Sequence, residues 1–292
     1  MNEEYKKKIE MIKYLRRFFE TKKCIEVFTP IIRVTCSPSM GRVKTQYGTY
    51  LRNCQESYLR LFMGYYGDVF EIGSSFRPEE QEDKTHGIEF TLLEAQMQSK
   101  TLKQMMELLE EIVKEFIPDA EFEVISIYEA IKQKLGIDIK AVGIAPVVEQ
   151  LNCIYPDFVY NQDFEIVNHF IHDEIEPLSK NKFVFFTEYP TCTLSIANNT
   201  QGESEIVNRF EFFINGIEVS NSYEYTEDVD EYISRNQIVE MYTPEESCIA
   251  ERIKSGLIPA QASVIGIGVE RLCMTLYGAK DISPFLHENN IF

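Results

Sequence analysis

Two glutamates flank a predicted turn in the stretch RFEFFINGIEVSN, residues 209–221. The Asn215-Gly216 pair is a strong signal for a two-residue type I′ turn, so this stretch is predicted to form a β-hairpin. Its register would pair Glu211 with Ser220 and leave Glu211 and Glu218 diagonal on one face, roughly 6–8 Å apart at their Cβ atoms. Two such carboxylates repel each other unless a cation lies between them, and hard oxygen ligands suit Mg²⁺. The alternative is a pair of solvated acids on an exposed face.

A second polar face is predicted in SSFRPEEQEDKTHGIEFTLLE, residues 74–94, and in the AQMQ that follows. Arg77 ends an apolar strand, and an acidic loop separates it from His86. Strand alternation then places five side chains on one face: Phe90, Leu92, Glu94, Gln96 and Gln98. An aromatic ring, an acid and amides are costly to bury together unless they meet a polar ligand. The alternative for Arg77 is a salt bridge to the acidic loop.

The stretch GIGVER, residues 266–271, leads from an apolar segment into a predicted helix with an arginine in its first turn. Glycine lets another group approach the backbone closely, and a helix N-terminus with a guanidinium favours an anion. Arg271 stands where a dinucleotide fingerprint has its third glycine, and the chain contains no GxxxxGK[ST] motif. The alternative is a tight strand-to-helix turn with a surface arginine.

Short strands and well-marked helices must position these groups. Apolar residues at helical spacing predict a helix within the first 23 residues: Ile9, Ile12, Leu15, Phe18 and Phe19. The basic residues of that segment, Lys8 among them, are interpreted as a solvated face. Strands are predicted over residues 24–32, where Pro30 breaks the strand, over 69–76 and 89–98, and from residue 182.

Two later helices carry clear start signals. Thr101 and Gln104 form a capping box, and Thr243 is predicted to cap a helix that has Pro244 in its first turn. A last helix is predicted from Val269 to about Gly278, and residues 117–180 read as mixed helix and loop. Strands that cluster without regular βαβ alternation predict an α+β fold, with an antiparallel β-sheet flanked by helices.

Composition narrows the class of protein. The 292 residues carry a formal net charge of −18, which argues against extended contact with nucleic acid. No apolar run approaches the length of a membrane span, and the N-terminus shows no secretory signal. The seven scattered cysteines include no CxxC pair and fit reduced thiols, so a cytoplasmic location without membrane contact is predicted.

Together the motifs resemble class II aminoacyl-tRNA synthetases, most closely their lysine/aspartate/asparagine subgroup. FETKKCIEVFTPII is similar to motif 1, FEIGSSFRPEEQEDKTHGIEFTLLEAQM to motif 2, and GIGVERLCMTLYGAKDISPF to motif 3, in the family's order. The stretches EYPTCTLSIANN and NRFEFFINGIEVSN also match the segment before motif 3. The resemblance covers most of the chain apart from the middle.

The resemblance implies roles in binding ATP and in catalysis. Arg77 would hold the α-phosphate and Arg271 the γ-phosphate, and these two arginines would be the catalytic residues. Glu79 and His86 would hold the nucleotide from the motif 2 loop, and Phe90 would stack on adenine. Glu211 and Glu218 would bind Mg²⁺, with Glu211 also counted among the ATP-binding residues.

The resemblance also implies a site for an amino-acid substrate. At two of its positions the chain departs from the family. Tyr225 stands where lysine-type members carry a glutamate for the substrate ammonium and aspartate-type members an arginine, and Gln96 replaces a tyrosine of lysine enzymes. A neutral or differently shaped amino acid is therefore expected. The implied contacts are Glu56, Glu94, Gln96, Asn221, Tyr223 and Tyr225.

Motif 1 begins near residue 18, so residues 1–292 are expected to form one catalytic domain without an anticodon-binding domain. The chain looks like a free-standing paralogue, similar to the ligase that attaches lysine to elongation factor P. We therefore expect transfer of an aminoacyl group to a protein or small molecule, with tRNA doubtful. Alternatives are an amide-forming synthetase similar to the archaeal asparagine synthetase, tRNA aminoacylation, and a non-catalytic regulator. The family implies a homodimer.

Overall fold

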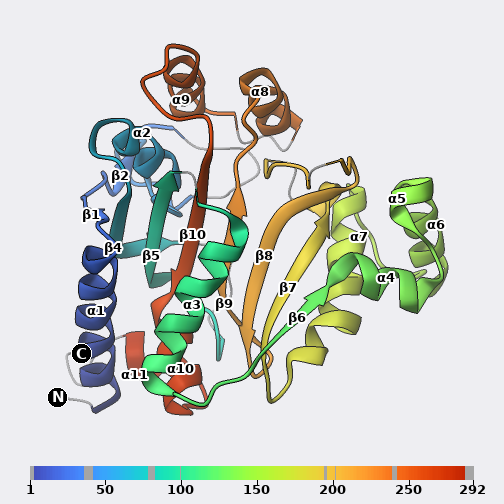
Figure 1. Ribbon diagram of the computed structural model, residues 1–292, viewed down its shortest axis with the longest axis horizontal. Coiled ribbons are helices and arrows are strands. Elements are labelled where there is room, and N and C mark those ends of the chain that lie inside the picture. Colours follow the sequence, from blue (N-terminus) through green and yellow to red (C-terminus); the bar gives the residue numbers. More distant parts are fainter. Residues whose placement is uncertain are drawn as a thin grey trace.

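The computed structural model describes residues 3–35, 42–77, 83–98, 100–193, 196–200, 202–238 and 242–286. Its centre is an eight-stranded sheet in the order β1-β4-β5-β10-β9-β8-β7-β6 (Figure 1). The strands are β1 (Ile25–Glu26), β4 (Val69–Phe76), β5 (Glu89–Gln98), β6 (Phe122–Ser126), β7 (Phe183–Pro190), β8 (Ile206–Ile214), β9 (Ile217–Glu224) and β10 (Ala262–Gly268). Only the two edge pairs, β1 with β4 and β6 with β7, are parallel, so the predicted α+β fold with an antiparallel sheet is confirmed.

Helices cover the two faces of the sheet unequally. One face packs against α1 (Glu3–Thr21), α3 (Leu102–Phe116), α10 (Val269–Tyr277) and α11 (Ser283–Leu286). The other face meets α2 (Glu56–Tyr66) and α9 (Pro244–Lys254) toward one end, and α4 (Ile127–Leu135), α6 (Ala145–Ile154) and α7 (Asp163–Phe170) toward the other. The remaining elements are β2 (Ile32–Arg33), β3 (Tyr50–Leu51), α5 (Ile139–Val142), α8 (Val229–Ile238) and three short turns, η1 (Ile171–Ile175), η2 (Glu176–Ser179) and η3 (Thr191–Thr193). Within these ranges, no helix is both long and apolar enough to cross a membrane.

Local signals place several element ends correctly. The Thr101 hydroxyl accepts a hydrogen bond from the backbone N–H of Gln104, and the Gln104 side chain accepts one from Thr101, which completes the predicted capping box of α3. Thr243 caps α9 as predicted. Gly278 adopts φ of 69° after α10, a left-handed conformation that suits glycine at a helix end.

Three predictions about the elements need correction. The strand expected over residues 24–32 is only two residues long in β1, because the chain leaves the sheet before Pro30. The middle segment contributes β6, which pairs in parallel with β7. In α1, Met11, Leu15 and Phe19 are buried with Lys8, so Lys8 does not belong to a solvated face.

The hairpin of β8 and β9 forms at the predicted turn but with a shifted register. Asn215 and Gly216 both have positive φ, 51° and 82°, as a type I′ turn requires. Beyond the turn, a β-bulge changes the pairing, so Glu211 lies opposite Asn221 and not opposite Ser220. The extra residue in β9 brings Asn221 onto the face that carries Glu218.

Candidate active site

The predicted site residues gather on the sheet face opposite α10. Glu94, Gly266, Asn221 and Glu211 form one row across β5, β10, β9 and β8. A pocket of about 290 Å³ opens beside this row. Nine of the predicted residues line it: Glu56, Arg77, His86, Phe90, Glu94, Glu218, Asn221, Tyr223 and Arg271. Glu79 lies outside the described residues.

One end of the pocket is built around two arginines. The Arg77 guanidinium carbon lies 5.1 Å from the ring centroid of Phe90. Arg271 donates through Nε to the Thr85 carbonyl oxygen at 2.9 Å and through Nη1 to the Glu218 carboxylate at 3.2 Å. The His86 ring lines the same end, and its Nδ1 lies 2.9 Å from Asp83 Oδ1. Two cationic groups beside an aromatic face provide the chemistry to hold phosphates and a flat base.

A buried ion pair supports this end from behind the sheet. Glu270, the residue before Arg271, accepts hydrogen bonds from the Thr91 backbone N–H at 2.9 and 3.0 Å. The Lys8 ammonium lies 2.8 Å from the same carboxylate, and both side chains are more than nine-tenths buried. Lys8 on α1 therefore fixes the first turn of α10, and with it Arg271, against β5.

The two hairpin glutamates lie on the same face as the arginines. Glu211 accepts a hydrogen bond from the Tyr189 hydroxyl at 2.8 Å and forms an ion pair with Arg209. Burial, together with the negative charge of Glu211, raises the pKa of Glu218. A cation between the two carboxylates would relieve their repulsion, so the donor chemistry of this pair suits Mg²⁺.

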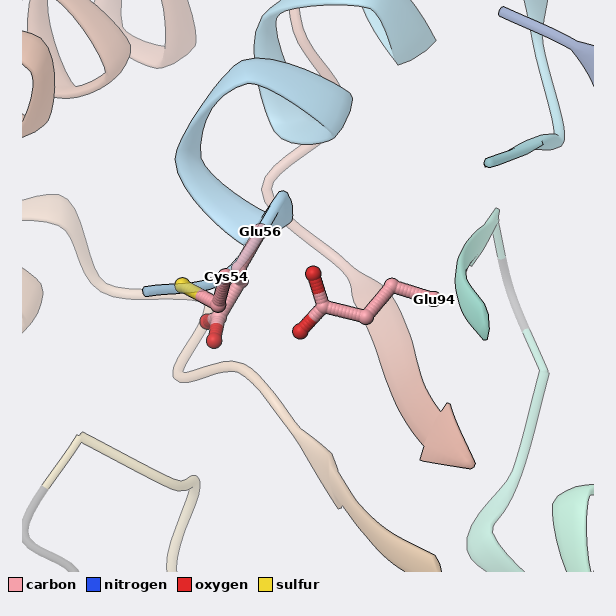
Figure 2. A group of neighbouring side chains, drawn as sticks. All are labelled: Cys54, Glu56 and Glu94. Carbon is pink, nitrogen blue, oxygen red and sulfur yellow. The ribbon is translucent and has the colours of Figure 1, made fainter. Parts of the chain in front are cut away.

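The other end of the pocket carries a compact acidic group. The Cys54 thiol and the carboxylates of Glu56 and Glu94 lie within 4.8 Å of one another, and Figure 2 shows them converging. Glu94 accepts a hydrogen bond from the Gln55 backbone N–H at 2.5 Å. Burial and the nearby charge of Glu56 raise the pKa of Glu94 to about 8. An ammonium group placed between the two carboxylates would relieve this repulsion.

Glycine keeps the floor of the pocket open between these acids and Asn221. Gly266 pairs with Glu94 on one side and with Asn221 on the other. A Cβ atom at this position would lie 3.9 Å from Glu94 Oε1, so the packing of the protein does not exclude a side chain there. It would instead project over the pocket floor, where it would compete with a ligand.

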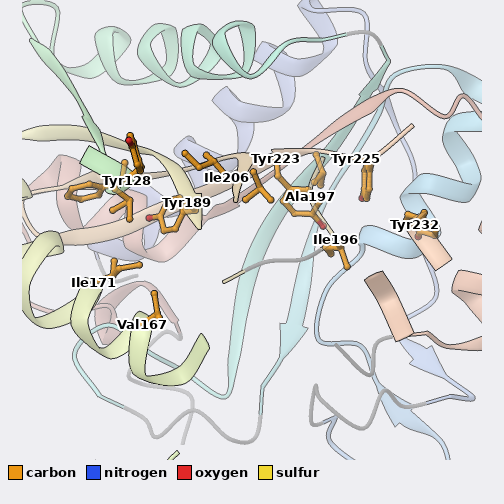
Figure 3. Close-up of a cluster of buried hydrophobic side chains, with 14 of the residues drawn as sticks. Tyr128, Val167, Ile171, Tyr189, Ile196, Ala197, Ile206, Tyr223, Tyr225 and Tyr232 are labelled. Carbon is orange, nitrogen blue, oxygen red and sulfur yellow. The ribbon is translucent and has the colours of Figure 1, made fainter. Parts of the chain in front are cut away.

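Two predicted residues, Gln96 and Tyr225, do not line the pocket but lie next to it, beyond Glu56. Tyr225 donates a hydrogen bond to Glu56 at 2.6 Å, and Gln96 donates one to the Tyr225 hydroxyl at 2.8 Å. Tyr223 also donates to Glu56. Figure 3 shows Tyr223 and Tyr225 in the cluster that continues to Tyr232.

The comparison with known protein families decides the class of this site. Residues 1–286 match the family described as tRNA synthetases class II (D, K and N). The chain belongs to this family. The resemblance inferred from the three motifs is thereby confirmed.

Curated relatives are similar along most of this chain. A lysine–tRNA ligase of Helicobacter pylori strain Shi470 is 29% identical over 97% of the chain and 62% of its own length. A lysine–tRNA ligase of Saccharolobus solfataricus is 27% identical over 94% of the chain and 62% of its own length. Lysine–tRNA ligase 2 of Methanosarcina mazei is 28% identical over 95% and 60%. The chain thus spans about three fifths of the length of these class II relatives.

Sequence reasoning missed several residues of this class II site. Arg209 is two positions before Glu211 on the same strand face, so alternation alone could have identified it. Cys54 lies two residues before Glu56, at the start of α2. Lys8 and Arg60 carried no local signal, because their partners are remote in the chain.

Proposed function

We propose that this chain activates an amino acid with ATP to form an aminoacyl-adenylate and then transfers the aminoacyl group to an acceptor. The observation that carries the proposal is the pocket that joins two arginines at one end to two carboxylates, Glu56 and Glu94, at the other. The curated relatives are lysine–tRNA ligases by name, which supports the same class of reaction.

The ATP would occupy the arginine end. Arg77 contacts the α-phosphate, Arg271 contacts the γ-phosphate, and Phe90 stacks on adenine with His86 beside it. We retain Glu79 as a nucleotide contact on the basis of its position in motif 2. The aromatic ring of Phe90 and the two guanidinium groups match the two parts of a nucleotide, its base and its phosphates.

Glu211 and Glu218 would hold Mg²⁺ next to these phosphates. When bound, the ion would neutralise negative charge on the phosphates. The support is chemical: both side chains are carboxylates on the same face of one hairpin, and burial together with the charge of Glu211 raises the pKa of Glu218. Arg209 forms an ion pair with Glu211, and Arg271 forms one with Glu218.

The first chemical step is an in-line displacement at phosphorus. A carboxylate oxygen of the amino acid attacks the α-phosphorus, and the bond to the bridging oxygen breaks, so that pyrophosphate leaves with the electron pair. In the second step the acceptor nucleophile attacks the carbonyl carbon and AMP leaves. The attacking carboxylate is already ionised, so positioning and charge stabilisation by Arg77 and Arg271 matter more than a general base.

Three classes of acceptor are possible for this transfer: a protein or small molecule, a tRNA, and ammonia or an amine. The sequence favours a protein or a small molecule as acceptor. The relatives named above are tRNA ligases, however, so the comparison gives no support for excluding tRNA. An amide-forming synthetase would instead use ammonia or an amine. Incubation with ATP, amino acid and each acceptor class, followed by mass spectrometry of the product, separates the three. A non-catalytic regulator would bind ATP but form no product.

Pyrophosphate exchange tests the proposed function. Labelled pyrophosphate should enter ATP only in the presence of an amino acid and Mg²⁺, and Arg77→Ala should abolish the exchange. Arg17→Ala is a matched control, because Arg17 is an exposed arginine on α1. If the protein binds ATP and none of the amino acids supports exchange, the adenylate proposal is wrong.

We also propose that two copies associate through the motif 1 segment and that the protein acts in the cytoplasm. Exposed apolar side chains, with exposed fractions from 46% to 77%, lie on this segment and just after it: Phe28, Ile31, Ile32 and Val34. Contiguous apolar side chains of this kind mark protein interfaces. Phe28→Asp combined with Val34→Asp should convert a dimer to a monomer in light scattering, whereas a wild-type monomer would refute the proposal.

A further inference from the structure

The amino-acid end of the pocket is closed by hydrogen bonds from two neutral side chains, Tyr225 and Gln96, that lead back from the Glu56 carboxylate. The described residues that line the pocket include Glu56 and Tyr223, but neither Gln96 nor Tyr225. Gln96 has no exposed surface and Tyr225 is 2% exposed. Because Tyr225 donates to Glu56 and Gln96 donates to Tyr225, these side chains form a wall across the space beyond Glu56.

A buried cation lies directly behind this wall. The Arg60 guanidinium carbon is 4.1 Å from the ring centroid of Tyr225, and Arg60 is 1% exposed. Its Nη2 donates to the carbonyl oxygens of Pro259 and Ala260, at 3.0 and 2.6 Å. Nε and Nη1 have no hydrogen-bond partner within the described part of the chain. A second cation at this place would be repelled by Arg60, and the buried carboxylate of Glu246, next to Tyr232, already accepts hydrogen bonds from Ser57 and Tyr232.

Uncharged groups line the space that remains in front of the wall. Cys54, Ile196 and Val264 line the pocket together with Tyr223, beside the carboxylates. Val264 lies between Gln96 and Tyr223 in one row of the sheet, so it forms the floor just before the wall. Such a site offers contact area to a small side chain and no partner for a charged one.

We propose that the substrate is a short, uncharged amino acid, held by its ammonium at Glu56 and Glu94 with its side chain against Cys54, Ile196 and Val264. This inference rests on the proposed function and narrows it. The Glu56–Tyr225–Gln96 wall then determines specificity, because it excludes long side chains by volume and cationic side chains by charge. The substrate carboxylate would point toward Arg77.

Amino-acid binding tests the inference separately from catalysis. Thermal stabilisation of the wild-type protein, with a non-hydrolysable ATP analogue and Mg²⁺ present, should be measured for glycine, alanine, serine, cysteine, threonine, valine, lysine, arginine, aspartate and glutamate. At least one short uncharged amino acid should bind at least 100-fold more tightly than lysine or aspartate. The inference is overturned if a charged amino acid binds most tightly. It is also overturned if no amino acid binds at concentrations up to about 10 mM, beyond the range of ordinary ligand affinities. Binding without pyrophosphate exchange supports it while refuting adenylate formation.

A change in the wall provides the second arm. Tyr225→Glu should weaken binding of the short amino acid at least tenfold and gain measurable lysine binding, because the new carboxylate replaces a neutral phenol beside Glu56. Tyr225→Phe keeps the ring and serves as the matched control; it should not bind lysine. Circular dichroism checks that both variants fold. If Tyr225→Glu does not fold, Tyr225→Phe and the wild-type panel still decide, since lysine binding by Tyr225→Phe overturns the role of the wall.

Discussion

The two ends of the pocket differ in how their charges are satisfied. At the arginine end, Arg271 contacts Glu218, and Lys8 supports its helix through Glu270. At the amino-acid end, Glu56 and Glu94 face each other, and only neutral groups complete the wall behind them. Under the proposed function, the difference teaches that the groups for activation keep the residue types that the family resemblance implies, whereas Gln96 and Tyr225, proposed to select the substrate, depart from them.

The arginine end should show the largest effect of a single substitution. Arg271→Ala should lower pyrophosphate exchange about 1,000-fold, because a preorganised charge near the reacting phosphates is lost. The KM for the amino acid should change little if the two ends act separately. Steady-state exchange kinetics measure both quantities, with Arg17→Ala as the exposed control. A rise in the amino-acid KM with unchanged kcat would contradict this division of the pocket.

The support behind the arginine end should appear in stability. Lys8→Met should lower the free energy of unfolding by about 3 kcal/mol, because it leaves Glu270 buried without its cation. The double variant Lys8→Met with Glu270→Gln should recover part of that loss. Urea unfolding measures the three variants against the wild type. A loss no larger than that of Lys13→Ala, an exposed position on the same helix, would show that the pair does not matter.

The metal pair should give a smaller effect. Glu218→Gln should weaken Mg²⁺ binding by about tenfold, since one of two carboxylate ligands becomes neutral. Titration of exchange activity with Mg²⁺ measures the change, and Glu107→Gln is a control on an exposed acid of α3. An unchanged Mg²⁺ requirement would assign the ion to other groups.

At the amino-acid end, the titration of Glu94 should make the stability of the protein depend on pH. The pKa of Glu94 is raised to about 8 in the folded protein, so the folded state binds this proton more tightly than the unfolded state. Wild-type stability should therefore fall as pH rises from about 4.5 to 8, and Glu94→Gln should lack that component. We expect the stability of Glu94→Gln relative to the wild type to increase steadily over this range. Thermal unfolding at several pH values that shows a constant difference would contradict the assignment.

Local patterns predicted much of this architecture. The capping box of α3 and the turn at Asn215 and Gly216 are set by neighbouring residues, so the sequence was enough to place them. Alternation in β5 correctly separated the pocket face from the buried Leu93 and Ala95. Motif spacing predicted that Arg77, Arg271, Glu94 and Glu218 lie close together, and they line one pocket.

Contacts between remote segments could not be predicted in the same way. The bulge in β9 is accompanied by hydrogen bonds from Ser220 to Gly266 and from Arg209 to Asn221. No residue type in the hairpin sequence predicts this bulge. The burial of Lys8 depends on Glu270, far along the chain. The prediction of a single catalytic domain over residues 1–292 stays a prediction.

Isotope transfer tests the central claim of amino-acid activation most directly. The protein would be incubated with ATP, Mg²⁺, hydroxylamine as acceptor and short uncharged amino acids that carry ¹⁸O in their carboxylates. Attack on the α-phosphorus predicts AMP with one ¹⁸O atom, together with pyrophosphate and an aminoacyl hydroxamate. AMP without ¹⁸O, or release of ADP and phosphate, would contradict the account.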